Sequence, residues 1–177
     1  VRGPGNETPI VAIAQPGLSG IGYRLLFPEK KPESEVDRLM QAGLIALRKP
    51  EFELLRIEAG LPGGNSELTA DYTPLEMGLL DLAISQTKGC YTGQEVIARQ
   101  VNFDKITRSL VGLRLSSPVQ IGESVSIDGK PAGKVTSMVH SPRFGDIALA
   151  VLKRPFEKTG TKVNLGDQAA KVTALPF

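Results

Sequence analysis

Two short apolar segments near the start of the chain predict a pair of strands. Residues 10–14 (IVAIA) are followed by Pro16 and Gly17, and residues 23–27 (YRLLF) are followed by Pro28. Compact apolar runs bounded by proline and glycine are typical of buried strands. The glycine-containing turn between them predicts a hairpin. Its glycines lie between two strands rather than before a helix, so they do not match a dinucleotide-binding fingerprint.

The next apolar positions recur at helical spacing. Residues 34–47 carry an apolar stripe, with Ser34 as the expected N-cap, and they predict the clearest helix of the chain. Residues 51–59 predict a short second helix that ends at Gly60. Residues 73–84 predict a third, largely buried helix, because a capping box and a proline at the first helical position coincide at its start.

The pattern changes after about residue 105. Short alternating runs follow one another roughly every ten positions, with Asp128 and Gly129 as a strong two-residue hairpin turn. This pattern predicts a small antiparallel β-barrel of about six strands. The expected fold class is therefore α+β, with an α+β domain at residues 1–105 and a C-terminal barrel at residues 106–177.

The first of these two parts has few strands for its number of helices. A two-stranded sheet leaves long open edges, which proteins normally cover or pair. Either a second copy pairs with this sheet or a preceding segment completes it. We expect a preceding segment, so that residues 1–105 form an incomplete domain.

Composition narrows the classes of function. The net charge is +2, the aromatic fraction is 5% and tryptophan is absent, so nothing favours a nucleic-acid surface. No run of residues approaches the length of a membrane span. One cysteine cannot form an internal disulfide, and one cysteine with one histidine cannot build a closed zinc site. An ion held by carboxylates stays an alternative. We expect no bound metal, no membrane association and a reducing compartment.

The single cysteine lies in the segment K-G-C-Y-T-G-Q-E at residues 88–95. Thr92 and Glu95 have the spacing of a capping box, which would place Cys90 close to the positive end of a helix. Lys88 adds a positive charge nearby. Such surroundings favour the thiolate and predict a reactive cysteine. The alternative is a small apolar side chain without chemistry.

Three segments together resemble one family. They are R-I-E-A-G-L-P at residues 56–62, P-L-E-M-G-L at residues 74–79 and K-G-C-Y-T-G-Q-E at residues 88–95. They resemble the YgfZ-type folate-binding proteins, which are relatives of the glycine cleavage T-protein, an aminomethyltransferase. The resemblance covers nearly the whole chain and about the second half of a family member. It implies a ferredoxin-like, T-protein-type folate-binding domain that is incomplete here.

The resemblance also implies a function. It implies a tetrahydrofolate-binding protein that supports iron–sulfur cluster assembly or repair, and through it the enzymes that modify transfer RNA. Folate and iron–sulfur proteins are the expected partners, without direct binding of nucleic acid. The expected location is the cytoplasm, or the mitochondrion or plastid of a eukaryote. The residues implied are Cys90 and Lys88 for catalysis, and Ser19, Tyr23, Arg56, Glu58, Glu76, Tyr91 and Gln94 for cofactor binding.

Two positions depart from the transferase pattern. The T-protein glutamate that helps to hold the pterin matches Ile21, and a T-protein arginine matches Phe52. Both changes remove polar partners of a buried pterin, so they weigh against aminomethyl transfer, which stays an alternative. A non-catalytic interaction module is a third interpretation. Arg56 and Glu58 could also form a solvated helix face or a structural ion pair, and Glu76 could serve mainly as a cap.

Overall fold

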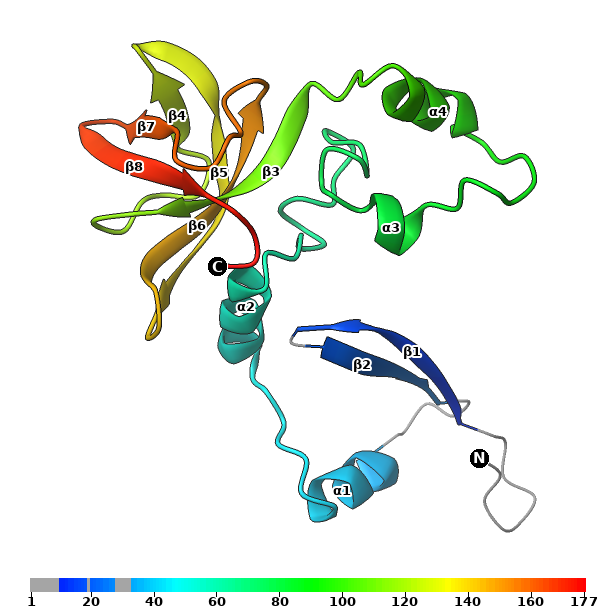
Figure 1. The fold of residues 1–177 in the computed structure, drawn as a ribbon. Helices are drawn as coiled ribbons and strands as arrows, with labels where there is room; N and C mark the ends of the chain where they lie inside the picture. The colour runs from blue at the N-terminus through cyan, green and yellow to red at the C-terminus, as the bar shows by residue number, and fades with distance from the viewer. Residues whose placement is uncertain (1–9, 19, 28–32) are drawn as a thin grey trace. The chain divides into compact units, whose positions relative to one another are not determined.

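The computed structural model describes residues 10–18, 20–27 and 33–177. The chain packs as two compact units, Val1–Phe52 and Glu53–Phe177, and each is described by itself (Figure 1). The prediction of a folate-binding domain over residues 1–105 and a separate barrel domain over residues 106–177 stays a prediction. Within the described ranges, no helix is both long enough and apolar enough to cross a membrane.

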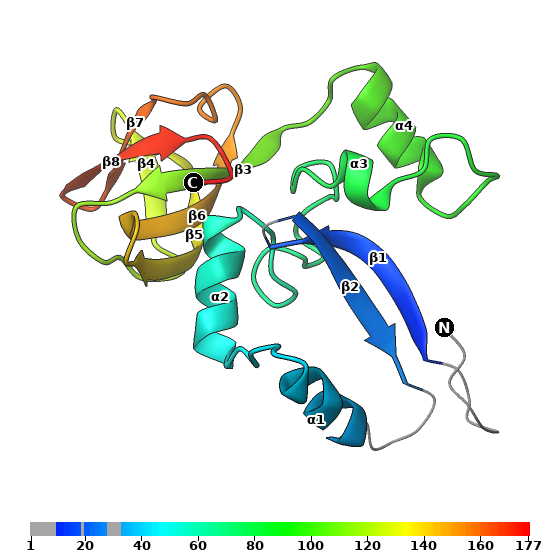
Figure 2. The same cartoon turned by 60° about the horizontal axis from the view of Figure 1, so that its bottom comes forward.

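The first unit contains a two-stranded antiparallel sheet. Strand β1 (Val11–Gly17) pairs with β2 (Gly20–Leu26) (Figure 2). In this pairing Val11 lies opposite Leu26. The predicted hairpin is confirmed. The expected burial of its first strand is wrong, because Val11 and Ile13 are exposed in the structure. Residues 10–105, where they are described, contain this one sheet and four helices, so a ferredoxin-like arrangement is not confirmed.

Helix α1 (Glu33–Gln41) is shorter than the predicted helix at residues 34–47. Its end is set by Gly43, which adopts a left-handed conformation with φ of 93°. The Gly43 amide donates to the Met40 carbonyl and the Leu44 amide donates to the Leu39 carbonyl, at 2.9 and 3.1 Å. This pair of bonds is a Schellman cap. The prediction that Ser34 caps the helix is also wrong, because α1 already begins at Glu33.

Helix α2 (Lys49–Glu58) agrees with the predicted second helix within two residues at each end. It ends at Gly60, whose φ is 68°, as predicted. The Gly60 amide donates to the Ile57 carbonyl and the Leu61 amide donates to the Arg56 carbonyl, which again makes a Schellman cap. Ile57 is buried, so the last turn of α2 is anchored by its apolar side chain.

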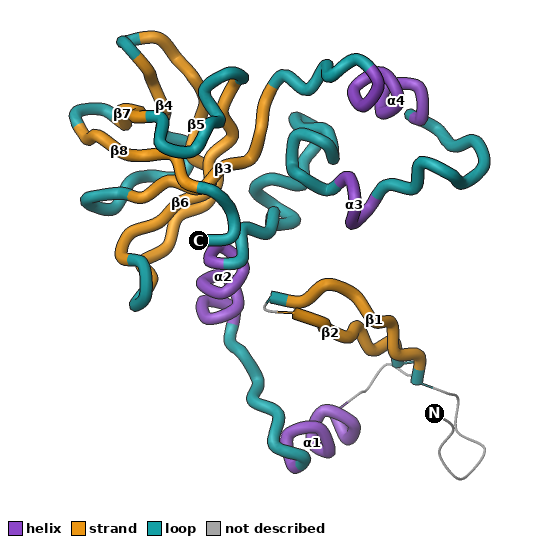
Figure 3. The backbone as a smooth tube through the Cα atoms, viewed as in Figure 1, coloured by secondary structure: helices purple, strands orange, loops and turns teal. Residues whose placement is uncertain are grey.

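The predicted helix at residues 73–84 is wrong. Only one turn forms after Thr73, and a four-residue helix, α3 (Leu80–Ala83), follows it (Figure 3). Gly78 separates the two pieces, with φ of 70° and a bond from its amide to the Leu75 carbonyl at 3.1 Å. Because Gly78 adopts a left-handed conformation, the helix stops after its first turn.

Helix α4 (Gln94–Asn102) confirms a helix after the cysteine, but its start differs from the prediction. The N-cap residue is Gly93, with φ of 89°, and no side chain caps the helix. The predicted capping box of Thr92 and Glu95 is therefore wrong. The Glu95 carboxylate instead accepts a hydrogen bond from the Arg99 guanidinium, four residues further along the helix.

Six strands in the C-terminal part form a closed antiparallel barrel, which confirms the predicted barrel (Figure 1). Around the barrel their order is β3-β6-β5-β4-β7-β8. Asp128 and Gly129 connect β4 to β5 with φ of 50° and 74°, as a type I′ hairpin turn requires. The strands are β3 (Arg108–Arg114), β4 (Ser124–Ile127), β5 (Lys130–Ser141), β6 (Gly145–Lys153), β7 (Lys162–Leu165) and β8 (Gln168–Thr173).

Alternation along β6 separates two apolar clusters. Ala148, Ala150 and Leu152 belong to the cluster inside the barrel, whereas Ile147 and Leu149 belong to a second cluster with Ile57 of α2. Successive side chains of a strand point to opposite faces, so β6 contributes to both clusters. The barrel is thus filled inside and packed outside against the end of α2.

Candidate functional site

Arg56 is held in a buried network at the end of α2. Its guanidinium donates to Glu53 Oε2 at 2.7 Å, to the Leu61 carbonyl at 2.7 Å and to Ser137 Oγ at 3.0 Å. Its Nη1 also approaches Glu67 Oε2 at 3.4 Å. Only 5% of Arg56 is exposed. The structure therefore excludes a solvated helix face for Arg56, whose ion pairs are with Glu53 and Glu67 and not with Glu58. A folate contact by this residue stays a prediction.

Glu67 is a member of this network that the sequence analysis missed. Its side chain is fully buried and accepts hydrogen bonds from the Gly63 amide at 2.7 Å, Ser66 Oγ at 2.6 Å and Ser137 Oγ at 2.7 Å. Burial alone would raise the pKa of the Glu67 carboxyl. The hydrogen bonds from these hydroxyls and this amide outweigh burial and hold the pKa below its usual value. Glu67 is therefore ionised at neutral pH and joins its loop to strand β5.

Glu58, two residues after Arg56, makes separate contacts. Its carboxylate accepts a hydrogen bond from Ser141 Oγ on β5 at 2.6 Å. Its backbone carbonyl accepts from the Phe177 amide at 3.0 Å. These bonds hold the end of α2 against the barrel and the C-terminal segment. The predicted folate contact by Glu58 is untested by this geometry.

Glu76 combines a cap with an ion pair. Its carboxylate accepts from the Thr73 amide at 3.0 Å, and its own amide donates to Thr73 Oγ1 at 3.4 Å, so the capping box forms as predicted. Arg108 donates to the same carboxylate at 2.9 and 3.1 Å, and Thr107 Oγ1 donates at 3.0 Å. Burial would raise the pKa of Glu76, but these bonds outweigh burial and lower it. The group ties the turn at Thr73 to strand β3.

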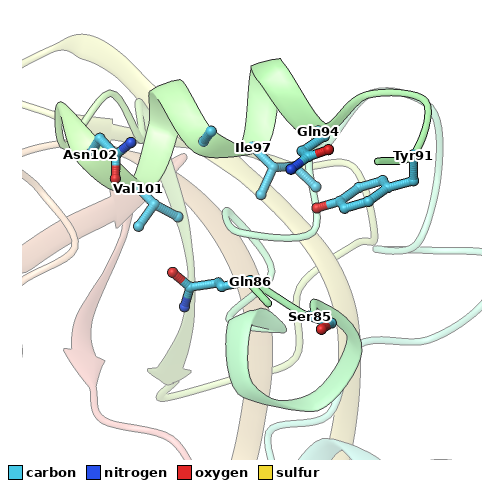
Figure 4. Close-up of a pocket in the computed structure, with 8 residues that line it drawn as sticks. Ser85, Gln86, Tyr91, Gln94, Ile97, Val101 and Asn102 are labelled. Atoms are coloured by element: carbon cyan, nitrogen blue, oxygen red, sulfur yellow. The ribbon is translucent and has the colours of Figure 1, made fainter. Parts of the chain in front are cut away.

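Tyr91 and Gln94 meet at a cavity of about 140 Å³ beside α4. Figure 4 shows Ile97, Val101 and Asn102 on the face of α4 that is directed towards Gln86. The wall combines side-chain amides, the hydroxyls of Ser85 and Tyr91, and apolar groups. It is formed by Ser85, Gln86, Tyr91, Gln94, Ile97, Ala98, Val101 and Asn102. The structure therefore brings two of the predicted cofactor-binding residues together in one cavity.

Lys88 and Cys90 lie in the loop before this cavity. Lys88 Nζ lies 4.5 Å from the centre of the Tyr91 ring, and the Lys88 amide donates to Ser85 Oγ at 3.1 Å. Cys90 is exposed. Lys88 thus contacts a wall residue of the cavity. The capping box that motivated a reactive thiol is absent at α4, so a catalytic role of Cys90 stays a prediction.

Two predicted contacts lie in the first unit. Ser19 falls outside the described residues. Tyr23 lies in β2 and is 67% exposed. The two departures from the transferase pattern, Ile21 and Phe52, are also exposed. No folate contact of the first unit is tested by this structure.

Comparison with known proteins gives consistent results. Residues 108–177 match the family described as the glycine cleavage T-protein C-terminal barrel domain. A proposed chloroplastic transferase of Arabidopsis thaliana is 35% identical over 162 residues, which are 90% of this chain and 37% of that protein. An aminomethyltransferase of Leptospira biflexa is 35% identical over 125 residues, which are 68% of this chain and 33% of that protein.

A solved structure shares the fold. The crystal structure of the glycine cleavage system aminomethyltransferase T from Bartonella henselae matches with a TM-score of 0.74 and 24% identity. The match covers 89% of this chain and 46% of that chain. The chain spans less than half the length of each of these three relatives. Together the sequence matches support a relationship of this chain to the T-protein superfamily.

Proposed function

Taking the T-protein superfamily as the premise, we propose that this chain is part of a tetrahydrofolate-dependent protein of aminomethyltransferase type. One observation carries this proposal. The 35% identity with the Leptospira biflexa aminomethyltransferase extends over 125 residues, which is more than the barrel segment 108–177 alone. The similarity therefore includes part of the segment that carries Tyr91, Gln94 and the buried network of Arg56.

The cavity beside α4 has the chemistry that a pterin ring requires. A pterin edge alternates hydrogen-bond donors and acceptors, and each of Gln86, Gln94 and Asn102 offers both. Tyr91 and the apolar side chains of α4 supply surfaces for a flat ring. A volume of about 140 Å³ lies below the roughly 300–1,000 Å³ of sites for complete drug-sized ligands. We therefore propose that the cavity takes one ring system of the folate.

Bound tetrahydrofolate would accept the one-carbon unit, while the residues of this chain bind and orient it. Gln94 and Tyr91 would contact the ring directly. Arg56 and Glu76 would act at a distance as positioning residues, because the ion pairs of Arg56 with Glu53 and Glu67, and of Glu76 with Arg108, hold segments that precede the cavity in the chain. Lys88, close to Tyr91, would hold the ring of that tyrosine in place.

Calorimetric titration of tetrahydrofolate into the protein tests this proposal. Gln94→Ala should weaken binding about 10-fold, since it removes a hydrogen-bonding amide from the cavity wall. Gln120→Ala is the matched control, because Gln120 is exposed and lies outside the cavity. The proposal would be contradicted by the absence of binding at about 100 µM tetrahydrofolate, which corresponds to roughly −5.5 kcal/mol. Equal losses in both variants would contradict it too.

A second candidate function is support of iron–sulfur cluster assembly or repair, as the resemblance to YgfZ-type proteins implies. The observation that favours it is the exposed Cys90 within K-G-C-Y-T-G-Q-E. One cysteine is far short of the four thiolates that a cluster usually takes, so we propose a transient role with an iron–sulfur protein as the partner. The cytoplasm, or an organelle in a eukaryote, is the proposed location.

Cys90→Ala separates the two candidates. In cells that depend on this protein, the variant should lower the activity of iron–sulfur enzymes, including those that modify transfer RNA, while the protein stays folded. Lys130→Ala, at an exposed position of the barrel, is the control. Full iron–sulfur enzyme activity with Cys90→Ala would exclude the second candidate. If the protein did not bind tetrahydrofolate and Cys90→Ala kept full cellular function, the non-catalytic interaction module would be the remaining interpretation.

A further inference from the structure

A second cavity, of about 260 Å³, lies outside the site described above. It is bounded by the segment before the Thr73 turn and by three neighbouring strands of the barrel, β3, β6 and β5. Within the described part of the chain, its wall contains three cationic side chains and no acidic one. The lining residues are Tyr72, Arg108, Pro131, Gly133, Lys134, Val151 and Lys153.

The positive charge of this cavity is only partly balanced. Arg108 pairs with Glu76 through its Nε and Nη2 atoms. Lys134 Nζ lies 5.6 Å from the centre of the Tyr72 ring, and Lys153 Nζ lies 3.4 Å from the Pro131 carbonyl oxygen. Across the described ranges, neither lysine forms an ion pair with a carboxylate. Two lysine charges therefore meet at one cavity without a paired carboxylate among the residues that the structure describes.

Strand register holds these charges together. Arg108 of β3 lies directly opposite Lys153 of β6, and Lys134 of β5 lies opposite Val151 of β6. Like charges directly opposite each other destabilise a sheet, so the placement of Arg108 opposite Lys153 destabilises the barrel. Lys153 and Val151 are two residues apart on one strand and share a face. The cationic side chains thus converge on the same side of the barrel.

Gly133 brings β5 close to β6 at this point. A Cβ atom at position 133 would lie 2.1 Å from the Val151 carbonyl oxygen, which no side chain could tolerate. The glycine therefore allows a close approach of the two strands, and its backbone forms part of the cavity wall. The cavity wall thus consists mainly of strand residues of the barrel, with Tyr72 from the preceding segment.

We propose that this cavity binds an anionic oxygen group, the carboxylate or phosphate of a small ligand. Lys134 and Lys153 supply the positive charge, and a lysine ammonium attracts such groups as a compact charge. Tyr72, Pro131, Gly133 and Val151 form the uncharged part of the wall. Arg108 fixes the position of the site through its ion pair with Glu76. The proposal does not rest on folate binding or on the chemistry of Cys90.

Titration of the ¹⁵N-labelled protein with inorganic phosphate and, separately, with glutarate tests the proposal by NMR. The amide signals of Gly133, Lys134 and Lys153 should shift with saturation at millimolar concentration. Saturable shifts with phosphate but not glutarate would identify phosphate as the preferred group, and the reverse result would identify a carboxylate. Lys134→Gln/Lys153→Gln should weaken binding at least about 10-fold, the loss expected for contacts to a charged group. Lys130→Gln/Lys162→Gln changes the net charge equally at exposed barrel positions outside the cavity, and it should bind as the unchanged protein does.

A stability measurement gives a second, independent readout. In low-salt buffer without either probe, Lys153→Gln should raise the thermal midpoint, because it removes the charge opposite Arg108. Addition of the preferred anion should raise the midpoint of the unchanged protein more than that of the variant. Three results would each overturn the proposal: no saturable shift with either probe, equal weakening in the two double variants, or a lower midpoint for Lys153→Gln.

Discussion

The two carboxylates that pair with Arg56 should differ strongly in their contribution to stability. Glu53 Oε2 lies 2.7 Å from the guanidinium and Glu67 Oε2 lies 3.4 Å from it, so distance alone ranks Glu53 first. Burial ranks them in the opposite order, because the side chain of Glu53 is 40% exposed and that of Glu67 is fully buried. We predict that burial decides, and that Glu67→Ala costs far more than Glu53→Ala.

The magnitude follows from what each substitution leaves behind. Glu53→Ala removes a partly exposed ion pair, which is worth up to about 1 kcal/mol because water screens it. Glu67→Ala leaves the buried Arg56 charge without its buried partner, which costs roughly 3–5 kcal/mol. It also removes the acceptor of the Gly63 amide and of two serine hydroxyls. In a protein of this size, that loss lowers the thermal midpoint by about 6–20 °C.

Urea denaturation followed by circular dichroism measures this difference. The two variants should unfold with the same m-value as the unchanged protein and with clearly different midpoints. Glu67→Gln is a third variant that keeps the shape of the side chain and removes its charge, and it should fall between the other two. If Glu53→Ala cost as much as Glu67→Ala, the assignment of the network to burial rather than to distance would be refuted.

Three further predictions concern stability. Glu67 and Glu76 both have a lowered pKa in the folded protein, so each stabilises the fold at pH values above the usual glutamate pKa of about 4.3. This contribution disappears as the pH falls through the lowered pKa, so the urea midpoint should be level above about pH 5 and fall below about pH 4. A urea midpoint that rises on acidification would contradict this prediction. Gly133→Ala should lower the free energy of unfolding by about 3 kcal/mol or more, because the new Cβ would lie 2.1 Å from the Val151 carbonyl oxygen. The control Gly64→Ala should change the urea midpoint little, because its Cβ would have nothing within 4 Å. Equal urea midpoints of the two variants would show that β5 and β6 can separate. Gly78→Ala should lower the free energy of unfolding by about 1–2 kcal/mol, because Gly78 has a left-handed backbone with φ of 70°. A variant that is more stable and has a stronger helical signal in circular dichroism would contradict this and would show that residues 73–84 can form one helix.

The barrel could be predicted from the sequence because its signals are local. Alternating apolar residues identify each strand, and the Asp128-Gly129 pair fixes the turn between two of them. The hairpin of the first unit was predicted for the same reason. Which strands pair across the barrel, such as β3 with β8, depends on contacts far apart in the sequence and could not be predicted from local patterns.

The helices show where periodicity fails. Gly43 and Gly78 lie at positions that suit an apolar helical stripe, so the pattern continued through them in the prediction. In the structure both adopt left-handed conformations and terminate helical turns. Thr92 and Glu95 have the right spacing for a capping box, yet Gly93 is the N-cap of α4. Spacing shows that a cap is possible, and the competing glycine decides whether it forms.

The candidate site was predicted where its members are close in sequence. Tyr91 and Gln94 lie three residues apart in one motif, and the structure places both at one cavity. Glu67 was missed because its partner Ser137 is 70 residues away in the chain. The only local signal was an acidic residue in the glycine-rich loop after R-I-E-A-G, and an exposed loop acid has the same local pattern.

The proposed binding of part of a tetrahydrofolate in the cavity beside α4 can be tested on the protein itself. NMR titration of the ¹⁵N-labelled protein with tetrahydrofolate maps the binding site residue by residue. We expect saturable shifts centred on the amides of Tyr91, Gln94 and Ile97, and weaker shifts in Gln94→Ala. Saturable shifts confined to other parts of the chain, or no shifts at all with the protein folded, would contradict it.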